Sequence, residues 1–161
     1  MARPHPLRVL MNTPLPPISQ QRRKVFRPSI REVHKTYDLI NKYVFNNKLK
    51  RPKITLSQCR DYWGLCTGLW YPTRSGRCVE IKLSDKWYCA QWMVAVLAHE
   101  MVHQYQWEIL GRNMEGKLKW NVMNHGPSFY EWRDTMAEYQ IPLNLFVMTS
   151  CQWFKMQSFD K

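Results

Sequence analysis

Closely spaced cysteines are the first feature that this sequence lacks. The five cysteines are odd in number and include no C-x-x-C pair: Cys59, Cys66, Cys78, Cys89 and Cys151. A disulfide framework needs an even set, and a cysteine-rich structural zinc site needs closely spaced pairs. We therefore expect neither of these, and predict buried free thiols in a reducing, intracellular compartment.

Long apolar runs are also missing. No stretch approaches the roughly 20 apolar residues that a membrane-crossing helix needs. Prolines interrupt the N-terminus, so it has no continuous apolar core of the kind found in a secretory signal. We expect no membrane partner. The 161 residues, 45% of them hydrophobic, instead predict one domain with a sizeable core.

Acidic residues are scarce in the first third of the chain. Residues 1–53 hold 13 Lys and Arg against Glu32 and Asp38, a balance of +11, whereas the remaining residues contribute +1 to the net charge of +12. Such a concentrated block favours binding to a polyanion, most plausibly DNA. The alternative is a solvated basic tail that binds nothing specific. The predicted nucleic-acid contacts are Arg22, Arg23, Lys24, Arg27, Lys48, Lys50, Arg51 and Lys53.

The N-terminal 28 residues differ in composition from the rest. They contain six of the ten prolines, six basic residues and no acidic residue. Because proline breaks helices and few apolar residues cluster here, we predict a basic, Pro-rich arm over 1–28 that is extended, poorly ordered and without core residues. The folded domain is expected over 29–161. It should open with a helix, because Ser29 and Glu32 form a capping-box pattern.

Short strand-like runs follow that helix. Ile54 to Ser57, Trp63 to Tyr71 and Val79 to Leu83 predict a small, mainly antiparallel sheet that includes a hairpin. Gly64 and Gly68 indicate bulges or a close approach of other backbone. With helices on both sides of these strands in the sequence, the predicted fold class is α+β, in a single domain.

The motif His99-Glu100-Met101-Val102-His103 stands inside an apolar run. Residues four apart share one face of a helix, so His99 and His103 can offer two imidazole nitrogens to one metal ion. Glu100 can then hold a water and take its proton, which is the chemistry of H-E-x-x-H zinc hydrolases. We expect this helix to be buried nearly all round, capped by Ser84 or Asp85 and ending at Gly111.

A catalytic zinc usually needs a third protein ligand. His125 is favoured, because Gly126 permits a tight turn, Pro127 suits a helix start, and residues 128–138 are compatible with a second helix. Glu131 is the rival candidate. Glu108 is a poorer one, since five residues beyond His103 place it on another face of the helix.

The sequence around these histidines resembles the SprT-like (Spartan-type) metalloproteases. The resemblance rests on His99-Glu-Met-Val-His-Gln, on His125-Gly-Pro-Ser-Phe, and on Gly64-Leu-Cys and Glu80-Ile-Lys-Leu in the predicted sheet, and it runs from about residue 30 to 138. It implies a zincin-like domain with one Zn²⁺ held by His99, His103 and His125, with Glu100 as catalytic base. It also implies a protease that acts on proteins bound or crosslinked to DNA. One departure is clear: nothing after His125 supplies the paired cysteines of the C-terminal zinc ribbon that many members carry.

The leading hypothesis is therefore a zinc-dependent endopeptidase brought to DNA by its basic N-terminal third, with a protein as substrate. A different class is a nucleic-acid-binding, packaging or virion-associated protein whose zinc site is only structural. Glu100 separates the two, because a structural site needs no base. A zinc hydrolase of another substrate is a third hypothesis, since the motif constrains the metal better than the substrate.

Overall fold

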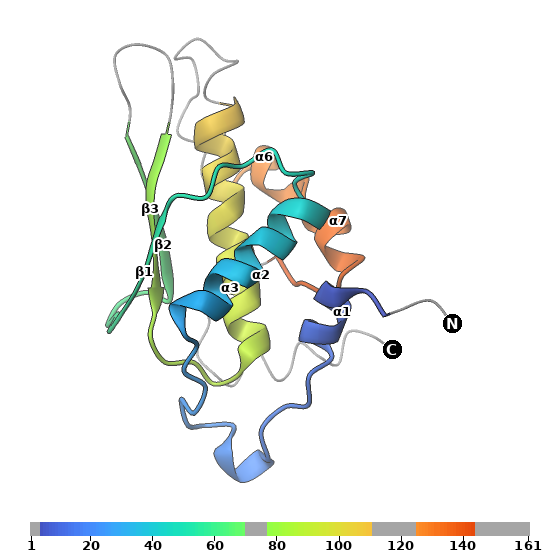
Figure 1. Ribbon diagram of the computed structural model, residues 1–161, viewed down its shortest axis with the longest axis vertical. Coiled ribbons are helices and arrows are strands. Elements are labelled where there is room, and N and C mark those ends of the chain that lie inside the picture. The colour runs from blue at the N-terminus through green and yellow to red at the C-terminus, as the bar shows by residue number, and fades with distance from the viewer. Residues whose placement is uncertain (1–3, 70–76, 111–124, 144–161) are drawn as a thin grey trace.

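The computed structural model describes residues 4–69, 77–110 and 125–143. Over these residues the chain is a single α+β domain (Figure 1). The central helix α3 has a three-stranded sheet along one side and the shorter helices along the other, with α2 crossing it. The predicted α+β class is confirmed. None of the described helices combines the length and the apolar run that a bilayer crossing demands.

Helix α3, Ala90–Tyr105, forms the centre of the core. Every residue from Gln91 to Val102 is buried, as the apolar run around the H-E-x-x-H motif predicts. The predicted cap is wrong, because Ser84 ends strand β3 and Cys89 is the residue before the helix. The segment between Ser84 and Cys89 contains Trp87, whose ring is buried and whose backbone forms a β-bridge with Phe26. After Tyr105 the helix widens into a π-helical segment, Gln106–Leu110. The predicted end at Gly111 lies outside the described residues.

The sheet comprises β1 (Lys53–Ser57), β2 (Gly64–Leu69) and β3 (Arg77–Ser84) in the order β1-β3-β2. Strands β2 and β3 form the predicted antiparallel hairpin, but β1 pairs with β3 in parallel. The prediction of a mainly antiparallel sheet is therefore wrong, and the sheet is mixed. Strands that are consecutive in the sequence usually pair, which would place β1 beside β2. Here β1 and β2 lie at opposite edges of the sheet, with β3 between them.

Two glycines let β2 approach the helix. A Cβ at Gly64 would lie 2.7 Å from Val96 Cγ1 and 2.9 Å from Glu100 Cγ, and one at Gly68 would lie 2.4 Å from the Trp107 ring. The strand register also shifts between Thr67 and Gly68, which is a bulge. The predicted bulge is confirmed at Gly68, while the groups that approach the two glycines closely are side chains and not backbone.

Helix α2, Ile30–Tyr43, begins with the predicted capping box. The Ser29 hydroxyl accepts the Glu32 N–H, and the Glu32 carboxylate accepts the Ser29 N–H at 2.7 Å. This bond lowers the pKa of the Glu32 carboxyl. Two such bonds satisfy N–H groups that a helix start leaves without partners. The buried side of the helix adds its apolar side chains to the core.

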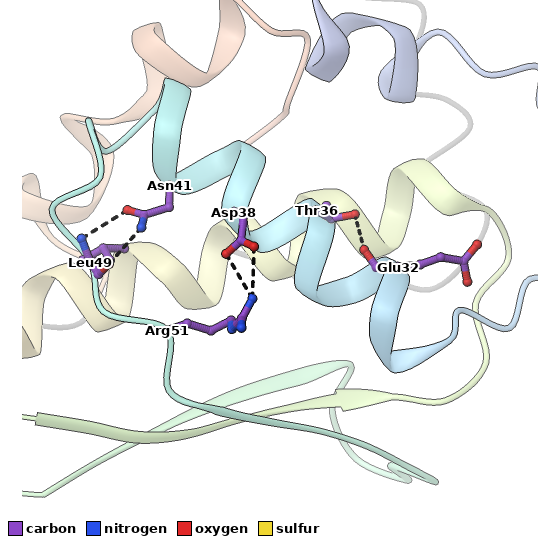
Figure 2. A network of polar contacts seen from close by, with 6 residues as sticks. All are labelled: Glu32, Thr36, Asp38, Asn41, Leu49 and Arg51. Carbon is purple, nitrogen blue, oxygen red and sulfur yellow. Dashed lines mark hydrogen bonds and ion pairs between the residues drawn. The ribbon is translucent and has the colours of Figure 1, made fainter.

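The basic loop after α2 folds back onto that helix (Figure 2). The Asn41 amide donates to the Leu49 carbonyl at 2.8 Å and accepts the Leu49 N–H at 3.1 Å. Arg51 then pairs with Asp38 at 3.0 Å on the exposed side of α2. Asn41 thus fixes where the loop leads into β1.

The N-terminal segment is more ordered than its composition predicts. Residues Pro6–Met11 form helix α1, in which Leu7 is fully buried and Met11 is 8% exposed. A short 3-10 turn, Ile18–Gln20, follows. The Gln91 side chain donates to the Thr13 carbonyl, and Arg8 donates to the Glu138 carbonyl at 2.9 Å. The expectation of an arm without core residues is wrong, because this short helix buries apolar side chains against distant elements.

Two short helices complete the described chain, α6 (Pro127–Tyr130) and α7 (Arg133–Ala137). The predicted helix over 128–138 is therefore broken in two. Phe129 and Met136 are fully buried and attach these helices to the core. Pro127 lies at the helix start, as predicted.

Candidate metal centre

Three histidines from two parts of the chain meet beside α3. His99 and His103 project from one face of that helix, with their Nε2 atoms 3.2 Å apart. His125 Nε2 lies 3.1 Å from His99 Nε2. One ligand atom from each residue lies within 4.8 Å of the others, so the group can hold a metal ion.

The spacing of these nitrogens fits zinc. Zn–N bonds of about 2.0–2.1 Å in tetrahedral geometry hold ligand nitrogens roughly 3.3 Å apart. The two separations of 3.1 and 3.2 Å are close to that value. Three imidazoles with a carboxylate beside them form a donor set suited to a catalytic zinc site, which keeps one position open.

Local structure places His125. It directly precedes Gly126, the N-cap of α6, and Pro127 provides the fixed φ of the first helical turn. Phe129, one turn later, packs its ring against all three imidazoles, with centroid distances of 4.7, 5.0 and 4.8 Å to His99, His103 and His125. The fully buried phenyl ring thus forms the floor of the site.

A glutamine that the sequence analysis missed orients His103. Gln106 Oε1 lies 2.9 Å from His103 Nδ1, and Gln106 Nε2 donates to Ser128 Oγ at 2.9 Å. A proton on Nδ1 leaves the Nε2 lone pair directed at the other histidines. The same glutamine also ties α3 to the helix that follows His125. The spacing of Gln106, three residues after His103, is the signal that could have identified it.

Glu100 lies on the side of α3 that faces β2. Its side chain is buried, and its Oε2 accepts the Cys66 backbone N–H at 2.8 Å. Burial raises the pKa of this carboxyl to about 8, and the Cys66 hydrogen bond opposes the rise only in part. With this pKa the metal-free protein holds Glu100 protonated at neutral pH, and a cation bound at the neighbouring histidines would favour the carboxylate that a general base needs.

The histidines are held in the form that binds metals. Burial lowers the pKa of His103 to about 4, the bond with Gln106 opposes this shift, and the nearby His125 adds to it. Burial also lowers the pKa of His125. Both rings are therefore neutral at pH 7, so a metal ion need not displace a proton from them.

The rival ligands lie elsewhere. Glu131 is exposed and is not part of the group of three. Glu108 is buried, but its carboxylate accepts a hydrogen bond from Gln104 at 3.1 Å. Within the described residues, the cluster of potential ligands is the one with His125 in third place.

The predicted nucleic-acid contacts are all exposed, and the structure separates them into two groups. One precedes α2, and the other follows it in the loop that folds back beside the helix, where Arg51 pairs with Asp38 (Figure 2). The Lys24 ammonium lies 4.6 Å from the centroid of the Trp63 ring, and Lys53 lies 3.7 Å from Glu80. The first group consists of Arg22, Arg23, Lys24 and Arg27, and the second of Lys48, Lys50, Arg51 and Lys53.

Comparison with known proteins gives one result. The model of the SprT-like family matches residues 33–151, which is most of the chain and includes all three histidines. A search of curated proteins finds no match.

Proposed function

Because this chain belongs to the SprT-like family, a zinc metallopeptidase-like family, we propose that it is a zinc-dependent endopeptidase acting on DNA-bound or DNA-crosslinked proteins. The observation that carries the proposal is the convergence of three imidazoles next to a buried carboxylate. The alternative, a nucleic-acid-binding or packaging protein with a structural zinc, gives Glu100 no role. A carboxylate buried without need would cost several kcal/mol.

In this proposal His99, His103 and His125 hold one zinc ion. The ion, when bound, acts as a Lewis acid and makes a water more acidic. Glu100 accepts the proton of the attacking water and later delivers it to the leaving amine. Gln106 keeps His103 in the correct tautomer, and Phe129 keeps bulk water away from the rings.

The free edge of β2 is where a substrate peptide would bind. Since the Cys66 N–H donates to Glu100, it points away from β3, which makes this side of β2 an edge that faces the catalytic residue. In the described residues, β2 pairs only with β3. An extended peptide added to this edge would pass close to the histidines.

Support for a DNA-associated substrate comes from charge. The two exposed basic groups carry eight cationic side chains, of which Arg51 and Lys53 have acidic partners, Asp38 at 3.0 Å and Glu80 at 3.7 Å. Lys24 lies over Trp63, an arrangement in which a base could stack beside a phosphate-binding cation.

The test is a cleavage assay with zinc-loaded full-length protein and a DNA-binding protein substrate, with and without single-stranded DNA. Glu100→Gln is the control, because it keeps size and hydrogen bonding but removes the base. We expect it to retain zinc and to cleave about 10²–10⁴-fold more slowly. Cleavage by this variant at the wild-type rate would exclude the catalytic assignment and favour a structural zinc.

DNA recruitment has its own test. Deleting 1–28 would remove core residues Leu7 and Met11, so charge must be removed by substitution. Replacing Arg22, Arg23, Lys24 and Arg27 with Gln should lower the affinity for DNA. The slope of log K against log salt concentration should become shallower by up to about 3.6 for duplex DNA. The control variant replaces four exposed cations elsewhere, Arg31, Lys35, Lys42 and Arg133. If both variants show the same slope, only net charge matters for DNA binding.

A further inference from the structure

Two free thiols lie in contact beside the proposed catalytic base. Cys66 on β2 and Cys78 on β3 have their sulfur atoms 3.1 Å apart. Cys66 is half-buried and Cys78 is buried. A disulfide needs about 2.05 Å, so the two sulfurs must approach by roughly 1 Å.

The strand geometry brings these side chains together. In the antiparallel pair, Cys66 is opposite Ile81 and Gly68 is opposite Cys78. The bulge between Thr67 and Gly68 therefore lies between the two cysteines along β2. A covalent bond between the sulfurs would span this irregular part of the ladder, where the backbone is less constrained by regular pairing.

The backbone of Cys66 is also linked to the metal centre. Its N–H donates to Glu100 Oε2 at 2.8 Å. Two residues earlier, Gly64 leaves almost no space, since a Cβ there would lie 3.0 Å from Glu100 Oε1. A shift of this strand would consequently reach the Glu100 carboxylate.

We propose that Cys66 and Cys78 form a reversible disulfide that displaces the Cys66 amide from Glu100 and switches the metal centre off. The oxidant is a small disulfide, such as oxidised glutathione. A cysteine thiolate attacks it and releases one small thiol, and the second cysteine then closes the Cys66–Cys78 bond and releases the other. Two protein S–H bonds and the oxidant's S–S bond break, one protein S–S bond forms, and both protons leave on the two small thiols.

The thiol pair is not reactive by default. The hydrogen bond with Cys78 and burial raise the pKa of the Cys66 thiol. Because the thiolate is the reacting species, oxidation should be slow at neutral pH and faster as pH rises. The pair therefore stays reduced until the supply of oxidant increases.

The experiment oxidises zinc-loaded full-length protein with oxidised glutathione and maps its cysteines by mass spectrometry without reductant. We expect a linked Cys66–Cys78 peptide, unchanged zinc content, and faster hydrogen exchange at the Cys66 amide. These readouts do not depend on activity. Detection of glutathione only at Cys59, or of no link, would overturn the proposal.

The effect on cleavage rests on the proposed peptidase function. Oxidation should lower the cleavage rate about 10- to 100-fold, the range for small displacements of a catalytic group, and a reductant should restore it. Cys78→Ser should cleave normally and resist the oxidant, with Cys78→Ala as a second variant should the first fold poorly. Cys59→Ser is the matched control and should remain sensitive.

The possible failures are distinguishable. A reduced protein that cleaves nothing contradicts the peptidase, while the peptide map still decides whether the disulfide forms. A mapped disulfide with undiminished cleavage contradicts the switch alone. Loss of zinc on oxidation would show that the effect acts through the histidines and would also overturn the link to Glu100.

Discussion

Helix α3 carries two polar clusters that differ in how their hydrogen bonds are satisfied. In the glutamine cluster, Gln104 accepts the Tyr37 hydroxyl at 2.9 Å and donates to the Lys50 carbonyl at 2.7 Å and to Glu108 at 3.1 Å. In the histidine cluster, the Nε2 atoms of His103 and His125 both converge on His99 Nε2.

The difference shows how to separate structural from functional polar residues in one helix. Each partner in the glutamine cluster complements the other, donor to acceptor, and the cluster joins α2, α3 and the basic loop. In the histidine cluster three ring nitrogens converge instead, and any of them that carries no proton directs a lone pair at its neighbours. A cation at their centre would bind these lone pairs. Four predictions test the distinction.

The largest expected effect is on the histidine cluster. His125→Ala should weaken zinc binding by roughly 100- to 1,000-fold, if the ~10–16 kcal/mol of a four-ligand zinc site is shared about equally among its ligands. Zinc titration with a competing chelator measures this. Glu131→Ala is the control and should bind zinc as the wild type does; the reverse pattern would move the third ligand to Glu131.

The glutamine cluster should respond in stability instead. Gln104→Leu removes this partner from two buried groups, the Tyr37 hydroxyl and the Glu108 carboxylate, at about 1–3 kcal/mol per group. We expect the free energy of unfolding to fall by about 3 kcal/mol while zinc affinity stays constant. Urea denaturation in the presence of a chelator gives the first quantity. If Gln104→Leu kept its stability but bound zinc more weakly, the distinction between a structural and a metal-binding cluster would be wrong.

The third prediction concerns pH in the metal-free protein. The pKa of Glu100 is about 8 when folded against 4.5 for a free carboxyl, so the native state retains this proton and stability is lost as pH rises through 8. The lowered pKa values of His103 and His125 act in the opposite direction, mainly below the ordinary histidine pKa of 6.5. From pH 6.5 to 8 the Glu100 contribution should therefore dominate, and stability should fall by about 1–2 kcal/mol.

Unfolding by urea at several pH values in that window checks the sign. Glu100→Gln should abolish the decline, because the amide does not titrate. An equal decline in this variant would assign the pH dependence to another group.

The smallest effect is expected at Gln106. Gln106→Ala removes the acceptor that holds the His103 ring, and zinc affinity should fall by about tenfold, at the low end for groups that orient ligands. Its free energy of unfolding should change less than that of Gln104→Leu. Measuring both properties on both variants compares two glutamines two residues apart, and a similar profile for the two would contradict the division into clusters.

The parts of the fold that depend on local chemistry could be predicted from the sequence. The capping box at Ser29 and the pairing of His99 with His103 follow from spacings of three and four residues along a helix. The place of His125 followed from Gly126 and Pro127, which define where a helix can start. In each case neighbouring residues contain the whole signal.

Features set by distant contacts could not be predicted. Helix α1 is only one and a half turns long, and its order depends on packing against α2 and α3. The parallel pairing of β1 depends on which sheet edge β2 leaves open. The spacing of Gln106 after His103 was a local signal for that contact, but its contact with Ser128, 22 residues further along the chain, left no trace in the sequence.

The π-helical segment Gln106–Leu110 has a consequence for insertions and deletions. A π-helical turn holds one residue more than an α-helical turn. Deleting a single codon in this segment would restore the regular helix but rotate everything after it by about 100°. A deletion at the start of the segment would thereby move Trp107 away from Gly68. We therefore expect this segment to tolerate substitutions at several positions but not a change in its length. Selection should act on the number of residues in it more than on their identity.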